Sequence, residues 1–99
     1  MTEEQIKKCN QIADHYGKSN QTVKFVEECA EAITAIQKLQ QVDNSVDCAK
    51  AYENLLEEIA DVRIMVQQMM HIHSELVISG IIDRKLNRQL YRMTDGREY

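Results

Sequence analysis

The chain has 99 residues with no proline and only three glycines, and its net charge is −4. This length holds one domain with one modest core, and the shortage of turn-forming residues excludes an antiparallel β-sandwich and favours an all-α fold. The acidic balance is unlike that of a protein that binds polymeric nucleic acid, and no apolar run reaches the roughly 18 residues that a membrane-spanning helix needs.

The cysteines indicate a reducing compartment. Cys9, Cys29 and Cys48 are odd in number, lack the Cys-x-x-Cys spacing of a zinc site and fall within helical patterns. The N-terminal segment is acidic and polar, unlike a signal peptide. We therefore expect a cytoplasmic protein without disulfides.

Four helices are expected within a single domain that spans residues 1–99. The first helix covers about residues 3–15, because Thr2 and Gln5 have the spacing of a capping box, in which each side chain bonds the backbone N–H of the other residue. Gly17 follows and favours the left-handed backbone conformation that ends many helices. The link is short, so the second helix is expected to pack beside the first.

The second helix is expected over about residues 20–42, with Ser19 or Asn20 as its N-cap. It ends where residues that favour turns cluster after position 42. Apolar residues recur along it at three- and four-residue spacing, which predicts one buried face. The main positions on that face are Val23, Val26, Ala30 and Ile33.

The third helix begins at Asn44 or Ser45 and meets no helix breaker before Ser79 and Gly80. A straight helix of about 34 residues would be roughly 50 Å long, whereas a compact chain of this size has a radius of gyration of only about 13 Å. Apolar residues also cover most of its circumference, as in helices that are buried on several sides. We therefore expect a kink or an extension into a partner, and a homo-oligomer.

The fourth helix is expected over about residues 81–93, so that the core spans residues 3–93 and a frayed tail covers residues 94–99. Its apolar residues predict a buried stripe, which consists of Ile82, Leu86, Gln89 or Leu90, and Met93. Its basic residues form a second stripe, which consists of Arg84, Lys85, Arg88 and Arg92. This basic stripe is either a solvated helix face or a clamp for phosphate groups.

Two pairs of carboxylates stand at equivalent places on the second and third helices. Glu28 and Glu31 are three residues apart, as are Glu58 and Asp61, so each pair lies on one helix face. A turn near residues 42–45 lets the two helices run antiparallel with the pairs opposite each other. Four such carboxylates would repel one another and lose hydration, and a cation that prefers oxygen ligands, Mg²⁺ or Mn²⁺, would relieve this cost. The pattern alone fits solvated helix faces equally well.

The order of these motifs resembles a known family. Glu27-Glu28-x-x-Glu31, a spacer, Glu58-x-x-Asp61 and a final Lys85-x-x-Arg88 are similar to the motifs of the MazG-like all-α nucleotide pyrophosphohydrolases, over about residues 5–93. The resemblance implies a four-helix bundle with a long third helix, assembled as a homodimer or homotetramer. It also implies Mg²⁺-dependent cleavage of a nucleoside or deoxynucleoside triphosphate between the α and β phosphates, which yields a monophosphate and pyrophosphate.

The resemblance also assigns roles to residues of this chain. It implies four metal ligands, which are Glu28, Glu31, Glu58 and Asp61. It implies that Lys85 and Arg88 bind phosphate, and that Glu27 either orients the attacking water or supports the site. Glu27 and Glu58 are the candidate catalytic carboxylates. Gln21 and Lys24 are weaker matches for nucleotide contacts.

Two other interpretations remain open. A phosphoribosyl-ATP pyrophosphohydrolase has a similar carboxylate pattern and a different substrate. A non-catalytic helical oligomer would also explain the apolar third helix. A ferritin-like di-iron centre is excluded because it needs Glu-x-x-His, and no glutamate stands three residues before any histidine of the chain. Stabilisation by a divalent metal would separate an enzyme from a scaffold.

Overall fold

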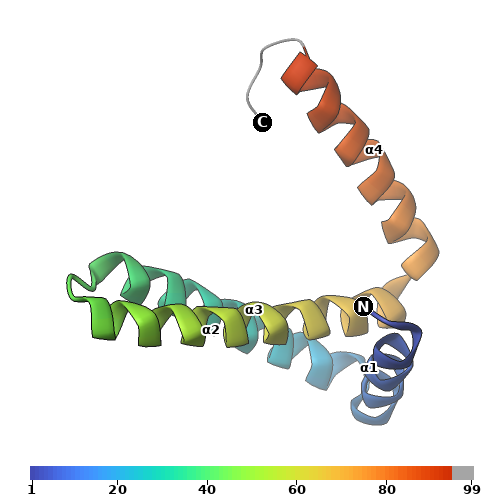
Figure 1. Cartoon of the computed structure of the whole chain (residues 1–99). Helices are drawn as coiled ribbons and strands as arrows, with labels where there is room; N and C mark the ends of the chain where they lie inside the picture. The colour runs from blue at the N-terminus through green and yellow to red at the C-terminus, as the bar shows by residue number, and fades with distance from the viewer. Residues whose placement is uncertain (95–99) are drawn as a thin grey trace.

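The computed structural model describes residues 1–94, and these residues form helices and no strand (Figure 1). The elements in chain order are α1 (Glu3–Tyr16), α2 (Lys18–Gln41), α3 (Ser45–His73) and α4 (Glu75–Thr94). The prediction of an all-α chain with four helices is confirmed. Within residues 1–94, no helix is both long enough and apolar enough to cross a membrane. The predicted frayed tail lies, from residue 95 on, outside the described residues.

The capping box at the start of α1 is present as predicted. The Gln5 backbone N–H donates to the Thr2 hydroxyl oxygen at 3.1 Å, and the Thr2 backbone N–H donates to the Gln5 side-chain carbonyl at 2.8 Å. At the other end, the Gly17 N–H donates to the Ala13 carbonyl at 2.9 Å. Gly17 has the positive φ that was predicted, +85°, but its ψ of 169° lies outside the left-handed helical region.

The N-cap predicted for α2 was wrong. Gly17 alone links α1 to α2, and its carbonyl already accepts the Gln21 N–H at 3.0 Å, so the helix begins before Ser19. Asn20 serves the preceding helix instead, because its side-chain amide donates to the Tyr16 carbonyl at 2.9 Å. A one-residue link through glycine therefore replaces the side-chain cap that was expected.

Helices α2 and α3 form a long antiparallel hairpin, and α1 packs against its open end (Figure 1). The hairpin turn is closed by Asn44, whose side-chain oxygen accepts the Asp47 backbone N–H at 2.9 Å, as predicted for an N-cap. Helix α1 is joined to α3 by a contact between Asp14 and His71, in which the carboxylate lies 2.8 Å from the imidazole ring.

The boundary between α3 and α4 lies earlier than predicted. Ser74 is extended, with φ −173° and ψ 102°, and its hydroxyl accepts the Val77 N–H at 3.3 Å, so it ends α3 and caps α4. The helix then continues through Ser79 and Gly80, which were expected to break it. A serine cap followed by Glu75 is thus a stronger boundary than a single helical glycine, which weakens a helix by only about 1 kcal/mol.

The apolar face predicted to be buried on α2 is exposed. Val26 retains 64% of its accessible surface and Ile33 retains 58%. The helix instead buries Gln21, Glu28 and Ala35, which lie roughly on the opposite side of its axis. The face that contacts α3 therefore combines these amide, carboxylate and small side chains with the half-buried Phe25 and Leu39, which helical spacing places on the same side.

Helix α4 stands apart from the other three helices (Figure 1). Among the described residues it contacts only α3, at their junction, and none of its own residues is buried. The radius of gyration of 16.7 Å exceeds the roughly 13 Å of a compact chain of this length. The stripe predicted to be buried is therefore exposed in the single chain, with Leu90 at 60% and Met93 at 72%.

Candidate functional site

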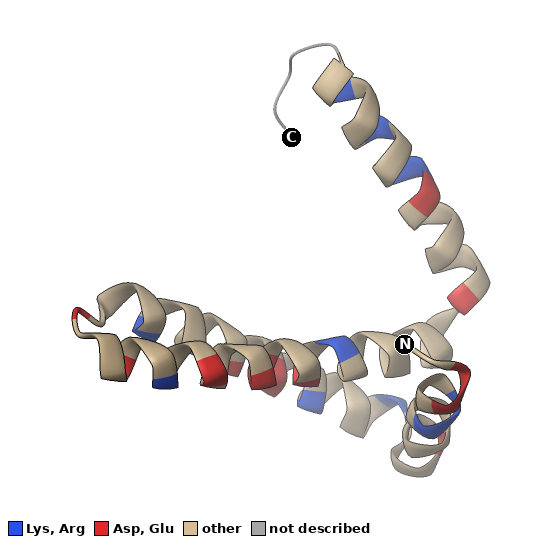
Figure 2. Ribbon diagram, in the orientation of Figure 1, with Lys and Arg blue, Asp and Glu red and all other residues tan. Residues whose placement is uncertain are grey.

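Three glutamates meet in the middle of the α2–α3 hairpin. Oxygen atoms of Glu28, Glu31 and Glu58 all lie within 4.8 Å of one another, and we call these residues the glutamate cluster. Figure 2 shows the acidic segments of the two helices side by side at this level. The spacing of three residues on α2 and the antiparallel pairing with α3 bring them together, as the sequence predicted.

The cluster contains two carboxylate oxygens that are buried and have no partner. Glu28 is only 7% exposed, and its Oε2 atom accepts no hydrogen bond from the described residues. The Oε2 atom of Glu58 is also buried and accepts no hydrogen bond from the described residues. Buried carboxylate oxygens lose hydration and need a cation or a donor in return. The donor set, made of oxygens from several carboxylates, fits a hard divalent cation such as Mg²⁺.

The surroundings of Glu58 favour its protonated form. Burial raises the pKa of Glu58, and the negative charges of Glu31, Asp61 and Glu28 raise this pKa further. Asp61, the fourth predicted ligand, is exposed and lies outside the cluster, one turn further along α3. It is nevertheless close enough for its charge to act on Glu58.

Lys24 is the cation that accompanies the cluster. Its Nζ lies 3.1 Å from a carboxylate oxygen of Glu28 and 3.6 Å from one of Glu27. The hydrogen bond to Glu28, and then the charge of Glu28, raise the pKa of Lys24. Glu27 is thereby held at the edge of the site, exposed and outside the cluster. One lysine satisfies one oxygen of Glu28 and leaves the other without a partner.

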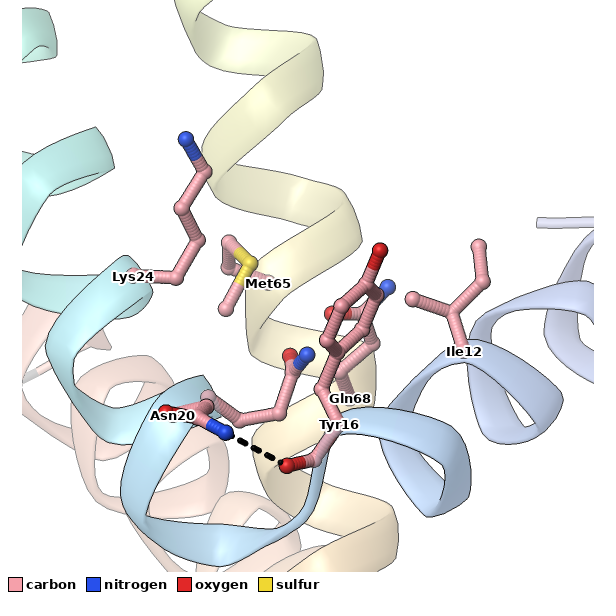
Figure 3. Close-up of a pocket in the computed structure, with 7 residues that line it drawn as sticks. Ile12, Tyr16, Asn20, Lys24, Met65 and Gln68 are labelled. Atoms are coloured by element: carbon pink, nitrogen blue, oxygen red, sulfur yellow. Dashed lines mark hydrogen bonds between the residues drawn. The ribbon is translucent and has the colours of Figure 1, made fainter.

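A cavity of about 360 Å³ opens beside the cluster, toward α1 (Figure 3). Three helices contribute to its walls, which consist of Ile12, Tyr16, Asn20, Gln21, Lys24, Met65 and Gln68. Gln21 is 4% exposed and its side-chain carbonyl has no hydrogen-bond partner among the described residues, and Gln68 is 2% exposed. We call this space the amide cavity. It includes both weaker candidates for nucleotide contacts, Gln21 and Lys24.

A second depression, of about 320 Å³, lies on the other side of the cluster, toward the hairpin turn. Glu31 and Glu58 line it together with Lys38 and Asn54. Neither Lys38 nor Asn54 was predicted as a site residue. Their positions were readable, because Lys38 follows Glu31 by seven residues and Asn54 precedes Glu58 by four, which places each on the same helix face as its glutamate.

The two predicted phosphate-binding residues do not reach the cluster within one chain. Lys85 and Arg88 are exposed on α4, and α4 does not contact α2. Figure 2 shows the basic segments of α4 well separated from the acidic segments of the hairpin. These two residues therefore complete the site only if α4 of another copy approaches it.

Comparisons with known proteins give no match. No protein-family model matches the chain, and no curated protein and no solved structure is significantly similar to it.

Proposed function

We propose that the protein is a metal-dependent pyrophosphohydrolase of the MazG-like type, which cleaves a nucleoside or deoxynucleoside triphosphate between the α and β phosphates. The observation that carries the proposal is the glutamate cluster with its two buried, unpartnered carboxylate oxygens. A solvated helix face would leave such oxygens exposed to water. Glutamates that converge from two helices, with Glu28 buried and Glu58 half-buried, are instead what an ion-binding site would need.

The proposed ligands of Mg²⁺ or Mn²⁺ are the three cluster glutamates, with Asp61 next to them. A bound ion would supply Lewis-acid chemistry: it would polarise a phosphoryl oxygen and neutralise the charge that develops during hydrolysis. Lys24 holds Glu28 in place through its 3.1 Å contact. Glu27, which lies beside the cluster against Lys24, and Glu58, which belongs to it, are the proposed residues that orient and activate the attacking water.

The departing pyrophosphate needs positive charge, and two sources are available. Lys38 and Asn54 lie within the same depression as Glu31 and Glu58 and offer an ammonium and an amide donor. Lys85 and Arg88 would be added by a second copy of the chain. Both kinds of donor stabilise negative charge on phosphate oxygens.

A homodimer or homotetramer accompanies this proposal. The outward face of α2 and the stripe on α4 expose apolar side chains such as Val26 and Leu90, at 64% and 60%. Extended apolar surface of this kind marks an interface. If α4 covers the hairpin of a second copy, it hides both surfaces and brings Lys85 and Arg88 toward that copy's glutamates.

The test is pyrophosphate release from a panel of ribonucleoside and deoxynucleoside triphosphates and phosphoribosyl-ATP, with Mg²⁺, with Mn²⁺ and with EDTA. Glu58→Gln is compared with Glu57→Gln, which removes the same charge from an exposed neighbour outside the cluster. Metal-dependent release that is lost only in Glu58→Gln supports the proposal, and the preferred substrate separates the two pyrophosphohydrolase classes. Absence of release together with absence of thermal stabilisation by metal would refute it and favour a helical scaffold.

A further inference from the structure

The direction in which α4 leaves the hairpin depends on very few groups. Ser74 is the one residue between α3 and α4, and its backbone torsions set the angle between the two helices. Its hydroxyl and its carbonyl accept the N–H groups of Val77 and Ile78, and these two bonds fix only the start of α4. Beyond this junction α4 contacts no other helix among the described residues. An interaction that crosses the junction is therefore what can hold α4 at one angle.

Gln67 of α3 makes such an interaction. Its side chain is buried, and the amide nitrogen donates to Oε1 of Glu75, in the first turn of α4, at 3.1 Å. The same nitrogen donates to the side-chain oxygen of Asn10, on α1, at 3.3 Å. Within residues 1–94, no other hydrogen bond joins a side chain of α3 to α4. One buried amide group thus uses its two hydrogens to reach two other helices, and we call these three residues the junction bridge.

The burial of Gln67 makes the junction bridge selective for one arrangement. A hydrogen bond to a carboxylate is stronger than one between two neutral groups. A buried N–H group that loses its acceptor has neither water nor a partner, which is unfavourable. Any rotation of α4 that takes Glu75 away from Gln67 carries this cost. Asn10 accepts the second hydrogen, so it holds the amide in the orientation that directs the first hydrogen toward Glu75.

A small change in the angle of α4 has a large effect at its basic residues. At a rise of about 1.5 Å per residue, Lys85 and Arg88 lie about 17 and 21 Å along the helix from Ser74. A rotation of about 30° at Ser74 would therefore displace them by about 9–11 Å. Groups that bind a reacting substrate have to be held to within about 0.5 Å of their productive positions. Both residues can serve a phosphate site only if the angle of α4 is fixed.

We propose that Gln67 and Glu75 are positioning residues, which fix the angle at which α4 leaves the hairpin and so place Lys85 and Arg88 for the glutamate cluster of a second copy. The role of Lys85 and Arg88 rests on the proposed function, whereas the fixed angle does not. This angle carries both residues away from the glutamate cluster of their own chain (Figure 2). The junction bridge therefore favours exchange of α4 between copies over closure of α4 onto its own hairpin.

The angle is measured without substrate or metal, from the distance between two spin labels on one chain. One label is attached to Cys48, which is exposed near the hairpin turn, and the other to Asn87→Cys, at an exposed position on α4. Cys29→Ser removes a competing thiol, and Cys9 is buried. An excess of unlabelled protein restricts the measured distances to those within one chain. With the junction bridge intact, we expect one narrow distribution of distances.

Glu75→Met and Glu75→Gln form a matched pair at an exposed position, so both variants should fold. Both remove the charge, but glutamine keeps a carbonyl that accepts from Gln67. Glu75→Met should shift or broaden the distribution by at least about 5 Å, because Asn87 lies about 20 Å from Ser74, and Glu75→Gln should leave it unchanged. Gln67→Met should resemble Glu75→Met, whereas Gln41→Met, at an exposed glutamine that ends α2, should have no effect. An unchanged distribution in Glu75→Met or Gln67→Met, or an equal shift in Glu75→Gln, would overturn the inference.

Pyrophosphate release separates failure of this inference from failure of the proposed function. In an active enzyme, Glu75→Met should lower kcat/KM at least about tenfold, and Glu75→Gln should restore it. The rise in melting temperature caused by metal should be the same in both variants. Release that is equal in the wild type and Glu75→Met would leave the hydrolase standing and overturn the inference. A distance that depends on the junction bridge, without any pyrophosphate release, would support the fixed angle and refute the proposed function.

Discussion

Replacing Glu58 by glutamine should stabilise the metal-free protein and weaken its response to metal. In the fold, burial and three neighbouring carboxylates raise the pKa of Glu58 above its ordinary value of 4.5. A group whose pKa is raised by folding binds its proton more tightly in the folded state, so stability falls as pH rises through that raised pKa. Glutamine keeps the shape and carries no charge. The metal-free variant should therefore melt higher than the wild type at pH 8 and lose less stability between pH 4.5 and pH 8.

Metal stabilises both proteins, but it should stabilise the variant much less than the wild type. A cation at ten times its dissociation constant stabilises the folded state by about 1.4 kcal/mol. For a domain of this size, this amounts to a rise of about 6–11 °C in melting temperature. The variant loses one of three cluster carboxylates, and a tenfold weaker affinity would reduce the gain at the same concentration to about 0.4 kcal/mol, or about 2–3 °C.

Differential scanning fluorimetry in EDTA and in a series of Mg²⁺ and Mn²⁺ concentrations measures both effects. Glu57→Gln carries the same charge change at an exposed position on α3 and should retain the wild-type metal response. A full response to metal in Glu58→Gln would refute the proposal that Glu58 is a metal ligand. A metal-free variant that melts below the wild type at pH 8 would refute the claim that the Glu58 charge destabilises the fold, because the cluster would then stabilise the protein without an ion.

Other changes test the link between helices, the assembly and the phosphate end of the site. Gly17→Ala should lower the free energy of unfolding, measured in urea, by about 1–3 kcal/mol, because φ +85° with ψ 169° is accessible almost only to glycine. The control Gly80→Ala lies within α4 with open space around it and should be neutral or stabilising. Leu86→Glu should reduce the mass in light scattering to that of a monomer, and the adjacent Asn87→Glu should not; an unchanged mass for Leu86→Glu would argue against an interface at α4. Lys38→Met should raise the KM for the triphosphate about tenfold in the pyrophosphate-release assay. The rise in melting temperature caused by metal should stay unchanged. A KM equal to that of the wild type would show that Lys38 does not contribute to the site.

The local rules of helix formation predicted much of this fold. The capping box at Thr2 and the cap at Asn44 are present because each depends only on residues within one turn. The cluster was also predictable, since three-residue spacing fixes the face and an antiparallel hairpin fixes the pairing. The boundary at Ser74 was missed because a glycine was given more weight than a serine–glutamate cap.

What the sequence concealed was which face of α2 turns inward. The apolar periodicity of Val23, Val26 and Ile33 is regular, and regular apolar faces usually form the core of their own chain. Here the face toward α3 carries Gln21 and Glu28 instead. Periodicity measures how apolar a face is, and it does not distinguish burial within one chain from burial against another.

The inverted burial of α2 connects the fold with the proposed activity. Only Cys9, Ala13, Ala35 and Met65 are buried apolar residues among those described, which is a small hydrophobic contribution for a chain of this length. Between α2 and α3, buried amides and carboxylates lie beside the half-buried Phe25 and Leu39, and the proposed site would use the polar groups. Under the proposed function the hairpin interior serves the site, so part of the stability is expected to come from the apolar faces outside it. The proposed assembly and the proposed activity would then depend on each other, because an oligomer that covers those faces compensates for the polar groups buried within the hairpin.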